Sequence, residues 1–132
     1  MAWARLSRLA RYWLPLAAYA GTIFVLSAMS RPPIPSVNLP YFDKVLHFGE
    51  YAGLGLLLCR ALTMGDRGLA PRSAFAAAAL LCALYGVSDE VHQMFVPQRE
   101  ADALDLLADV AGAASGAGLY ALFVGRRRTA TT

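Results

Sequence analysis

The chain has 132 residues, of which 58% are hydrophobic and 16% are charged, and its formal net charge is +3. This length fits one domain, and so few charged residues exclude an ordinary soluble protein surface. The sequence therefore predicts a single domain over residues 1–132 that is all-α and spans a membrane.

Four apolar stretches predict the membrane-spanning helices. The first contains 18 consecutive uncharged residues, Tyr12–Met29, close to the roughly 20 residues that cross a bilayer core. A soluble four-helix bundle is the alternative, but each of its helices would carry a polar stripe. The first, third and fourth stretches have no such stripe over their uncharged lengths. We therefore expect a polytopic membrane four-helix bundle with spans at about 12–30, 44–64, 73–95 and 103–125.

The first stretch also resembles a secretory signal, because arginines precede it and serine and alanine residues follow it at 27–30. Its apolar run is longer than the usual core of about 7–15 residues. A retained helix is therefore preferred over a cleaved signal.

Prolines predict the loops on one side of the bundle. Pro32, Pro33, Pro35 and Pro40 prevent a helix after the first span, because proline fixes φ and restricts the residue before it. Residues 36–39 within this loop are expected to lie over the polar residues as a flap. Pro97 is expected to end the third helix.

Basic residues are distributed unequally between the two ends of the predicted helices. Nine of the 12 fall at one end, and only Arg31, Lys44 and Arg99 fall at the other. By the positive-inside rule, both termini and the 65–72 loop are expected in the cytoplasm. This topology accounts for the positive net charge, so no nucleic-acid partner is predicted.

Eight of the nine carboxylates and both histidines lie in two segments that this topology places at the outer end. Helical spacing gathers them on three faces. Glu50 and Asp109 each lie one to two turns into their helices, about 10 Å from the helix start. Ionisable groups at such positions are costly and mark a site. The three faces comprise Asp43, His47, Glu50 and Tyr51 of the second helix; Asp89, His92 and Gln93 of the third, with Glu90 about 100° away; and Asp102, Asp105 and Asp109 of the fourth.

Some of these polar residues have a purely structural interpretation. Charged residues at helix ends are expected to be solvated, and those in the first turn of a helix are also stabilised by the helix dipole if they are acids. The residues with this structural interpretation are Asp43, Glu100 and Asp102. Each histidine fits either an interfacial position or a site. For the acids in apolar surroundings, we expect either a functional role or an internal ion pair with Lys44 or Arg99. These acids are Glu50, Asp105 and Asp109.

Small residues inside the spans predict packing. Gly112 and Gly116 have the spacing of a close helix contact, and Gly49 and Gly53 are interpreted in the same way. The two cysteines, Cys59 and Cys82, lack the spacing of metal ligands and are expected to be inert core thiols.

A motif pattern in these segments resembles the VanZ-like membrane protein family, from about Asp43 to Gly118. The pattern reads Asp43-Lys44-x-x-His47-Phe48-x-x-Tyr51, then Asp89-Glu90-x-x-Gln93-x-Phe95-x-Pro97-x-Arg99, then Asp105 and Gly112-x-x-x-Gly116. The resemblance implies a small multi-pass protein of the bacterial inner (cytoplasmic) membrane. Its namesake is an accessory protein in glycopeptide-antibiotic resistance clusters and is associated with teicoplanin resistance. Where the family is expected often to carry Asn, this chain has Asp109, which adds a carboxylate.

Ligand binding at the outer leaflet is the preferred function. A lipid-linked envelope precursor, a glycan or a glycopeptide would suit the site, because carboxylates and amides bind hydroxyls and amines. The lipid bilayer is the other expected partner. The residues expected to bind the ligand are Asp43, Lys44, His47, Glu50, Tyr51, Asp89, Glu90, Gln93, Arg99, Asp105 and Asp109.

Two other functions remain open. A membrane enzyme would draw an acid–base pair from His47, Glu50, Asp89, His92 and Asp105. A divalent cation such as Mg²⁺ or Ca²⁺ would suit the oxygen-rich cluster, although no motif requires a cofactor. A proton or ion relay is less favoured, because no charged residue links the outer cluster to Arg60.

Overall fold

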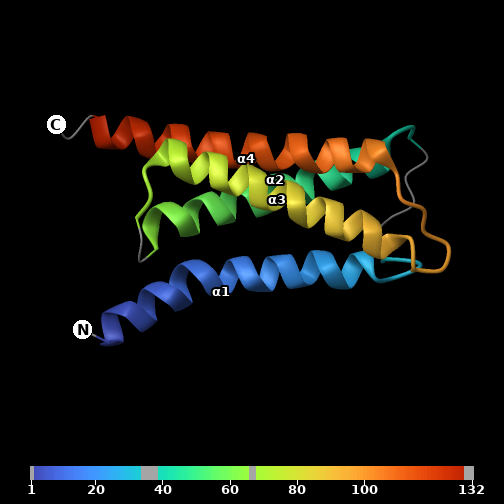
Figure 1. Ribbon diagram of the computed structural model, residues 1–132, viewed down its shortest axis with the longest axis horizontal. Coiled ribbons are helices and arrows are strands. Elements are labelled where there is room, and N and C mark those ends of the chain that lie inside the picture. The colour runs from blue at the N-terminus through green and yellow to red at the C-terminus, as the bar shows by residue number, and fades with distance from the viewer. Residues whose placement is uncertain (1, 34–38, 66–67, 130–132) are drawn as a thin grey trace.

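The computed structural model describes residues 2–33, 39–65 and 68–129 (Figure 1). Within these residues it contains no strand and four helices: α1 (Ala2–Ser27), α2 (Phe42–Met64), α3 (Pro71–Gln93) and α4 (Ala103–Thr129). All four are long and apolar enough to cross a membrane. The predicted all-α membrane architecture is confirmed. Residues 36–38 of the expected flap lie outside the described residues.

Several helix boundaries differ from the expected limits of the spans. Helix α1 begins at Ala2 rather than near residue 12. Arginine is a good helix former, so the arginines before residue 12 restrict which part of the helix enters the membrane but do not delay the start of the helix. Helix α3 ends at Gln93 rather than near residue 95, before Pro97 is reached. It begins at Pro71, whose fixed φ suits the first helical position.

Helices α2 and α4 form the closest pair of the bundle. A Cβ atom added to Gly112 would collide with the backbone carbonyl of Phe48, and one added to Gly116 would collide with that of Ala52. The predicted close contact of this glycine pair is confirmed, and its partner is α2. Bare glycine lets two backbones approach to this distance.

A helix contact was also predicted for Gly49 and Gly53; it is present at Gly53 and absent at Gly49. A Cβ on Gly53 would meet the side chain of Tyr19 on α1, whereas one on Gly49 would meet nothing within 4 Å. Gly49 follows Phe48, whose backbone faces α4, so it is turned about 100° away from that helix. It faces outward.

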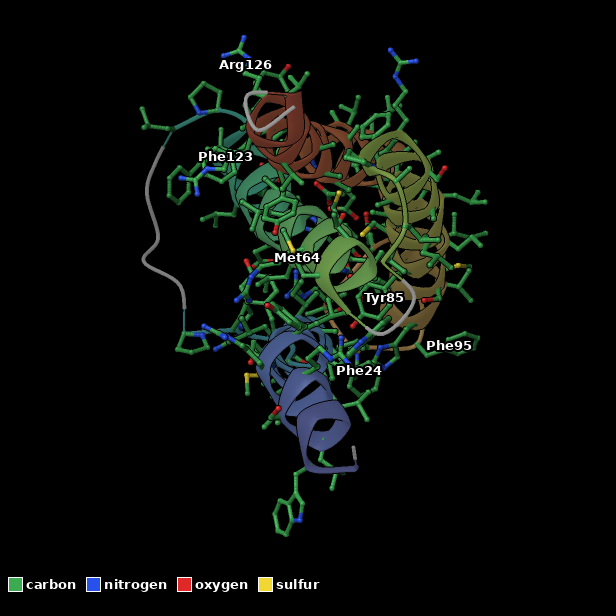
Figure 2. All side chains as sticks on the ribbon, turned by 90° about the vertical axis from the view of Figure 1, so that its left-hand side faces the viewer. Phe24, Met64, Tyr85, Phe95, Phe123 and Arg126 are labelled. Carbon is green, nitrogen blue, oxygen red and sulfur yellow. The ribbon has the colours of Figure 1, made fainter. Side chains whose placement is uncertain are left out.

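Helix α1 packs against α2 and, over a smaller contact, against α3, and its first turns diverge from the bundle toward the N-terminus (Figure 1). Tyr85 of α3 donates a hydrogen bond to the carbonyl of Ala20 at 2.8 Å, and Figure 2 shows this tyrosine directed into the space between the helices. Tyr19 donates to the carbonyl of Glu50 on α2 at 3.1 Å. These bonds place the last two turns of α1 beside the polar segments of α2 and α3.

The core below these polar segments is apolar. Cys59 and Cys82 are free and buried within it, as expected of core thiols. Tyr51 is fully buried in the same cluster, so the polar end of the bundle rests on a packed interior.

Candidate functional site

The polar residues gather at one end of the bundle, where α1 and α3 end and α2 and α4 begin (Figure 1, right). This follows from the alternating direction of the four helices, which brings the two acid-rich segments to the same level. Side chains from α2, α3 and α4 meet there in two connected parts. One is a partly buried ionic cluster between these three helices, and the other is a small cleft for which α1 forms one wall.

Lys44 is the cation of the ionic cluster. Its Nζ lies 2.8 Å from Asp43 Oδ2, 2.5 Å from Asp102 Oδ2 and 2.8 Å from Asp105 Oδ1. Only 18% of its side chain is exposed. Lys44 was expected to be an internal ion-pair partner, and for Asp105 this is confirmed.

Asp102 joins three helices at the start of α4. Its Oδ1 accepts the backbone N–H of Leu104 at 2.8 Å, the bond of a helix N-cap. Its own backbone N–H donates to Glu90 Oε2 on α3 at 2.8 Å, and its Oδ2 binds Lys44 on α2. The hydrogen bond from Lys44 holds the pKa of Asp102 below its ordinary value. A structural helix-end role was expected for Asp102, and the capping bond agrees with it.

His47 is held between two acids of α4. Its Nδ1 donates to Asp109 Oδ1 at 2.9 Å, and its Nε2 lies 3.8 Å from Asp105 Oδ2. Asp109 is fully buried and Asp105 is 7% exposed. The imidazole is thereby fixed in orientation by a buried carboxylate, as a ligand-binding or proton-transferring histidine requires.

Glu90 completes the cluster from α3. It is 7% exposed, although helical spacing placed it on a different face from Asp89. One of its carboxylate oxygens, one Asp109 oxygen and one His47 ring nitrogen all lie within 4.8 Å of one another. Glu90 faces α2 and α4, while Asp89 faces the cleft.

The cleft has a volume of about 70 Å³ and lies between α1, α2 and α3. Five predicted site residues of α2 and α3 line it together with the arginine of the next loop: Asp43, His47, Glu50, Asp89, Gln93 and Arg99. Gln93 donates to Asp89 Oδ2 at 3.1 Å, which fixes both side chains. His47 belongs to both the cleft and the ionic cluster, so the two parts form one continuous polar site.

Arg99 lines the cleft without the expected ion pair. Among the described residues, its hydrogen bonds go to the backbone carbonyls of Leu26, at 3.4 Å, and Met29, at 3.2 Å. The last carbonyls of a helix lack intrahelical partners, and a basic side chain satisfies them. Arg99 therefore caps α1, and the expectation that it pairs with an internal carboxylate is wrong.

Two predicted residues lie outside both the ionic cluster and the cleft. The ring of His92 stacks on Phe24 of α1, with centroids 4.9 Å apart, and His92 does not line the cleft. Tyr51 lies deeper, fully buried and with its ring 6.2 Å from that of Tyr85. Its position supports the floor of the site rather than its wall.

The α1 wall of the cleft was missed by the sequence reasoning. It consists of Ile23, Leu26 and Ser27. Ser27 is 6% exposed, and its hydroxyl oxygen has no hydrogen-bond partner among the described residues. A buried serine in the last turn of an apolar helix was the only signal, and its position beside α2 and α3 depends on tertiary packing.

A larger hollow at the opposite end of the bundle has a different chemistry. It lies between the start of α3 and the end of α4, and its lining is mostly apolar, with Phe75 and Leu122 among its residues. Among the described residues, no carboxylate lines it. Figure 2, viewed from this end, shows Phe123 and Arg126 projecting from α4 toward the outside. The acid-rich end is therefore the stronger candidate for a specific site.

Comparison with protein families gives one result. The family model described as VanZ/LLP1 matches residues 4–124, nearly the whole chain. No curated protein and no solved structure matches the chain.

Proposed function

Since the chain belongs to the VanZ/LLP1 family of membrane proteins, we propose that it binds the polar head of a lipid-linked ligand in the cleft between α1, α2 and α3. The ligand class is a lipid-linked envelope precursor with amino or hydroxyl groups. The proposed location is the bacterial inner membrane, with the cleft near the outer leaflet and both termini in the cytoplasm.

The observation that carries this proposal is the lining of the cleft. Three carboxylates, of Asp43, Glu50 and Asp89, face the same small space as the amide of Gln93. Carboxylate oxygens accept hydrogen bonds from ammonium and hydroxyl groups, and the bonds to charged donors are the stronger. An excess of acceptors over donors selects a ligand that is rich in donors.

The size of the cleft limits what can enter. A volume of about 70 Å³ corresponds to roughly two to three water molecules, since one water occupies about 30 Å³ in the liquid. An amino group or part of one sugar ring fits this space, but a whole glycopeptide antibiotic does not. A glycopeptide would therefore engage the site only through a projecting amine.

The membrane gives such a ligand a route to the cleft. Helix α1 forms one wall of the cleft and packs mainly against α2. Only 6% of the apolar, potentially membrane-spanning segment of α1 is buried inside the bundle. Leu26 and Ile23 of this wall are apolar neighbours for an acyl or polyprenyl chain, while the acids receive the head. A lipid-linked ligand matches both chemistries at once.

Native mass spectrometry of the protein extracted in mild detergent tests the proposal. Wild type is expected to carry a lipid-linked adduct, and Glu50→Gln or Asp89→Asn is expected to reduce its occupancy at least tenfold at unchanged membrane abundance. Glu100→Gln removes an exposed carboxylate of the neighbouring loop and serves as the matched control. Equal adducts in all four proteins would refute binding in the cleft.

A membrane enzyme acting on a lipid-linked envelope substrate is the second candidate. It is favoured by the hydrogen bond from His47 to the buried Asp109, because a carboxylate that orients an imidazole is the arrangement of a general base. Incubation with a membrane lipid extract separates the two functions. Binding predicts that the adduct is recovered intact, whereas catalysis predicts a new product that His47→Asn abolishes.

A role in glycopeptide resistance would follow from precursor binding. Expression in a sensitive host is then expected to raise the tolerated teicoplanin concentration, and Glu50→Gln is expected to remove this effect. An unchanged tolerance in cells that contain the wild-type protein would exclude this role while leaving ligand binding to be judged by mass spectrometry.

A further inference from the structure

We propose that His47, Glu90 and Asp109 form a binding site for a divalent transition-metal ion, with Zn²⁺ as the best match. The site lies behind the cleft, between α2, α3 and α4. It does not depend on the proposed lipid ligand, because Glu90 and Asp109 do not line the cleft.

The geometry supplies three ligand atoms from three different helices. One imidazole nitrogen and two carboxylate oxygens lie within 4.8 Å of one another. Zinc binds such atoms at about 2.0–2.2 Å, so the ligand atoms must approach one another by on the order of 1 Å. Rotation of the carboxylates covers this movement, and the helices keep their positions.

Unpaired oxygens at the same place are the second observation. Glu90 is 7% exposed and Asp109 is fully buried. Each carboxylate has one oxygen bonded, Glu90 Oε2 to the N–H of Asp102 and Asp109 Oδ1 to His47. The other two, Glu90 Oε1 and Asp109 Oδ2, are buried without a hydrogen-bond partner among the described residues.

The orientation of the unpaired Asp109 oxygen agrees with this site. A Cβ atom added to Gly86 would lie 3.3 Å from Asp109 Oδ2, so this oxygen points from α4 toward α3. Glu90 lies one turn further along the same helix. Buried oxygens that lack a donor call for an ion or a donor molecule, and these two belong to the residues of α3 and α4 that each offer a ligand atom within 4.8 Å of the others.

The local charges favour a cation. The four buried acids are Asp89, Glu90, Asp105 and Asp109. Among the described residues, Lys44 is the cation of this cluster, and it already binds three carboxylates, of which only Asp105 is one of these four. Since Arg99 is bonded to carbonyls, a bound divalent ion would supply the missing positive charge.

The donor set selects the kind of ion. Mg²⁺ and Ca²⁺ prefer sites made only of oxygen ligands, whereas imidazole suits Zn²⁺ and neighbouring transition metals. One imidazole and two carboxylates match the donor set of a three-protein-ligand zinc site. The proposed ion therefore differs from the Mg²⁺ or Ca²⁺ that the acid-rich composition suggests.

Isothermal titration of the chelator-treated protein in detergent with Zn²⁺ alone tests the site. Wild type is expected to bind one Zn²⁺ per chain with a Kd in the micromolar range or tighter, and Mg²⁺ is expected to give no saturable signal. His47→Asn and Glu90→Gln are expected to weaken zinc binding by about 100-fold, the upper range for losing even a supporting group of a metal site. The X-ray absorption spectrum of the zinc complex is expected to show one imidazole ligand.

Two controls keep the test decisive. His92→Asn removes the chain's only other histidine, whose ring packs on Phe24 of α1, and Glu100→Gln removes an exposed acid; both are expected to bind Zn²⁺ within about twofold of wild type, because neither side chain belongs to the proposed ligand set. Circular dichroism and a monodisperse elution profile establish that each variant is folded. Wild type without saturable zinc binding, or folded His47→Asn and Glu90→Gln variants that bind as wild type does, would overturn the proposal.

The two proposals fail separately. Glu50→Gln and Asp89→Asn change the cleft and are expected to lose the lipid adduct while they keep zinc. Glu90→Gln changes the metal site behind it and is expected to lose zinc first. A protein that binds zinc but carries no lipid adduct refutes only the lipid proposal, and the reverse result refutes only the metal site.

Discussion

Replacing Gly112 with alanine is expected to separate α2 from α4 next to the polar site. The new Cβ would overlap the backbone carbonyl of Phe48, which cannot rotate away as a side chain could. A carbon normally stays about 3.3 Å or more from a carbonyl oxygen, so the two helices must part by on the order of 1 Å. Overpacking of this kind costs about 1–3 kcal/mol.

The same movement reaches the site, because His47 precedes Phe48 and Asp109 lies one turn before Gly112. Their hydrogen bond is 2.9 Å long, and a separation on the order of 1 Å would take it beyond bonding distance. Loss of a hydrogen bond to a charged group adds about 1.5–3 kcal/mol. The total expected loss for Gly112→Ala is therefore about 2–6 kcal/mol, or somewhat less where the helices relax.

Gly49→Ala provides the matched control within the same helix pair. Its Cβ would meet nothing within 4 Å, and alanine is favoured over glycine inside a helix by about 0.5–1 kcal/mol. Thermal unfolding of the purified proteins in one detergent is the assay. We expect a clearly lower Tm for Gly112→Ala and an unchanged or higher Tm for Gly49→Ala. Equal stability of the two variants would refute the close-contact explanation.

Three further predictions concern the charged end and the topology. Lys44→Met is expected to destabilise the protein by about 1–3 kcal/mol, because the buried carboxylate of Asp105 loses its cation. Asp43→Asn, at a side chain that is 61% exposed, is expected to change stability by less than about 0.5 kcal/mol; chemical unfolding in detergent measures both, and a reversed order would contradict the network. The pKa of Asp102 is lowered by Lys44, so its contribution is complete above the ordinary pKa of about 3.9 and is lost as pH falls through the lowered value. Asn also caps helices, so Asp102→Asn should lower Tm at pH 7, and its difference from wild type should disappear as pH falls through the lowered pKa of Asp102; a difference that persists in acid below that pKa would contradict the charge effect. Reporters fused after Gly68 and after Gln98 are expected on the cytoplasmic and the outer side respectively, and a cytoplasmic reporter at Gln98 would overturn the outward orientation of the cleft.

The helices and the shared level of the acids could be predicted because they depend on local patterns. Uncharged runs set the spans, and helical spacing placed Glu50 and Asp109 at a similar depth, about 10 Å inside their helices. His47 was placed on the same face as Glu50, so its hydrogen bond to Asp109 then required only that α2 and α4 be neighbours. Gly112 and Gly116 gave the signal for that contact.

The features that depend on packing against two partners could not be predicted. Helical spacing separated Glu90 from Asp89 by about 100°, yet both are buried, because α3 contacts α2 and α4 on one side and borders the cleft on another. Arg99 was expected beside a carboxylate, but the free carbonyls at the end of α1 lie within its reach. The cleft wall at Ser27 depends on the position of α1, which no spacing within one helix determines.

Photocrosslinking from a single cleft position measures ligand binding most directly. A photoreactive residue in place of Leu46, which lines the cleft, is compared with one in place of Leu107, which is 63% exposed on α4. Binding in the cleft predicts a lipid-linked precursor adduct from position 46, absent from position 107 and lost when Glu50→Gln is added. The same bulk-phospholipid adducts from both positions would contradict it.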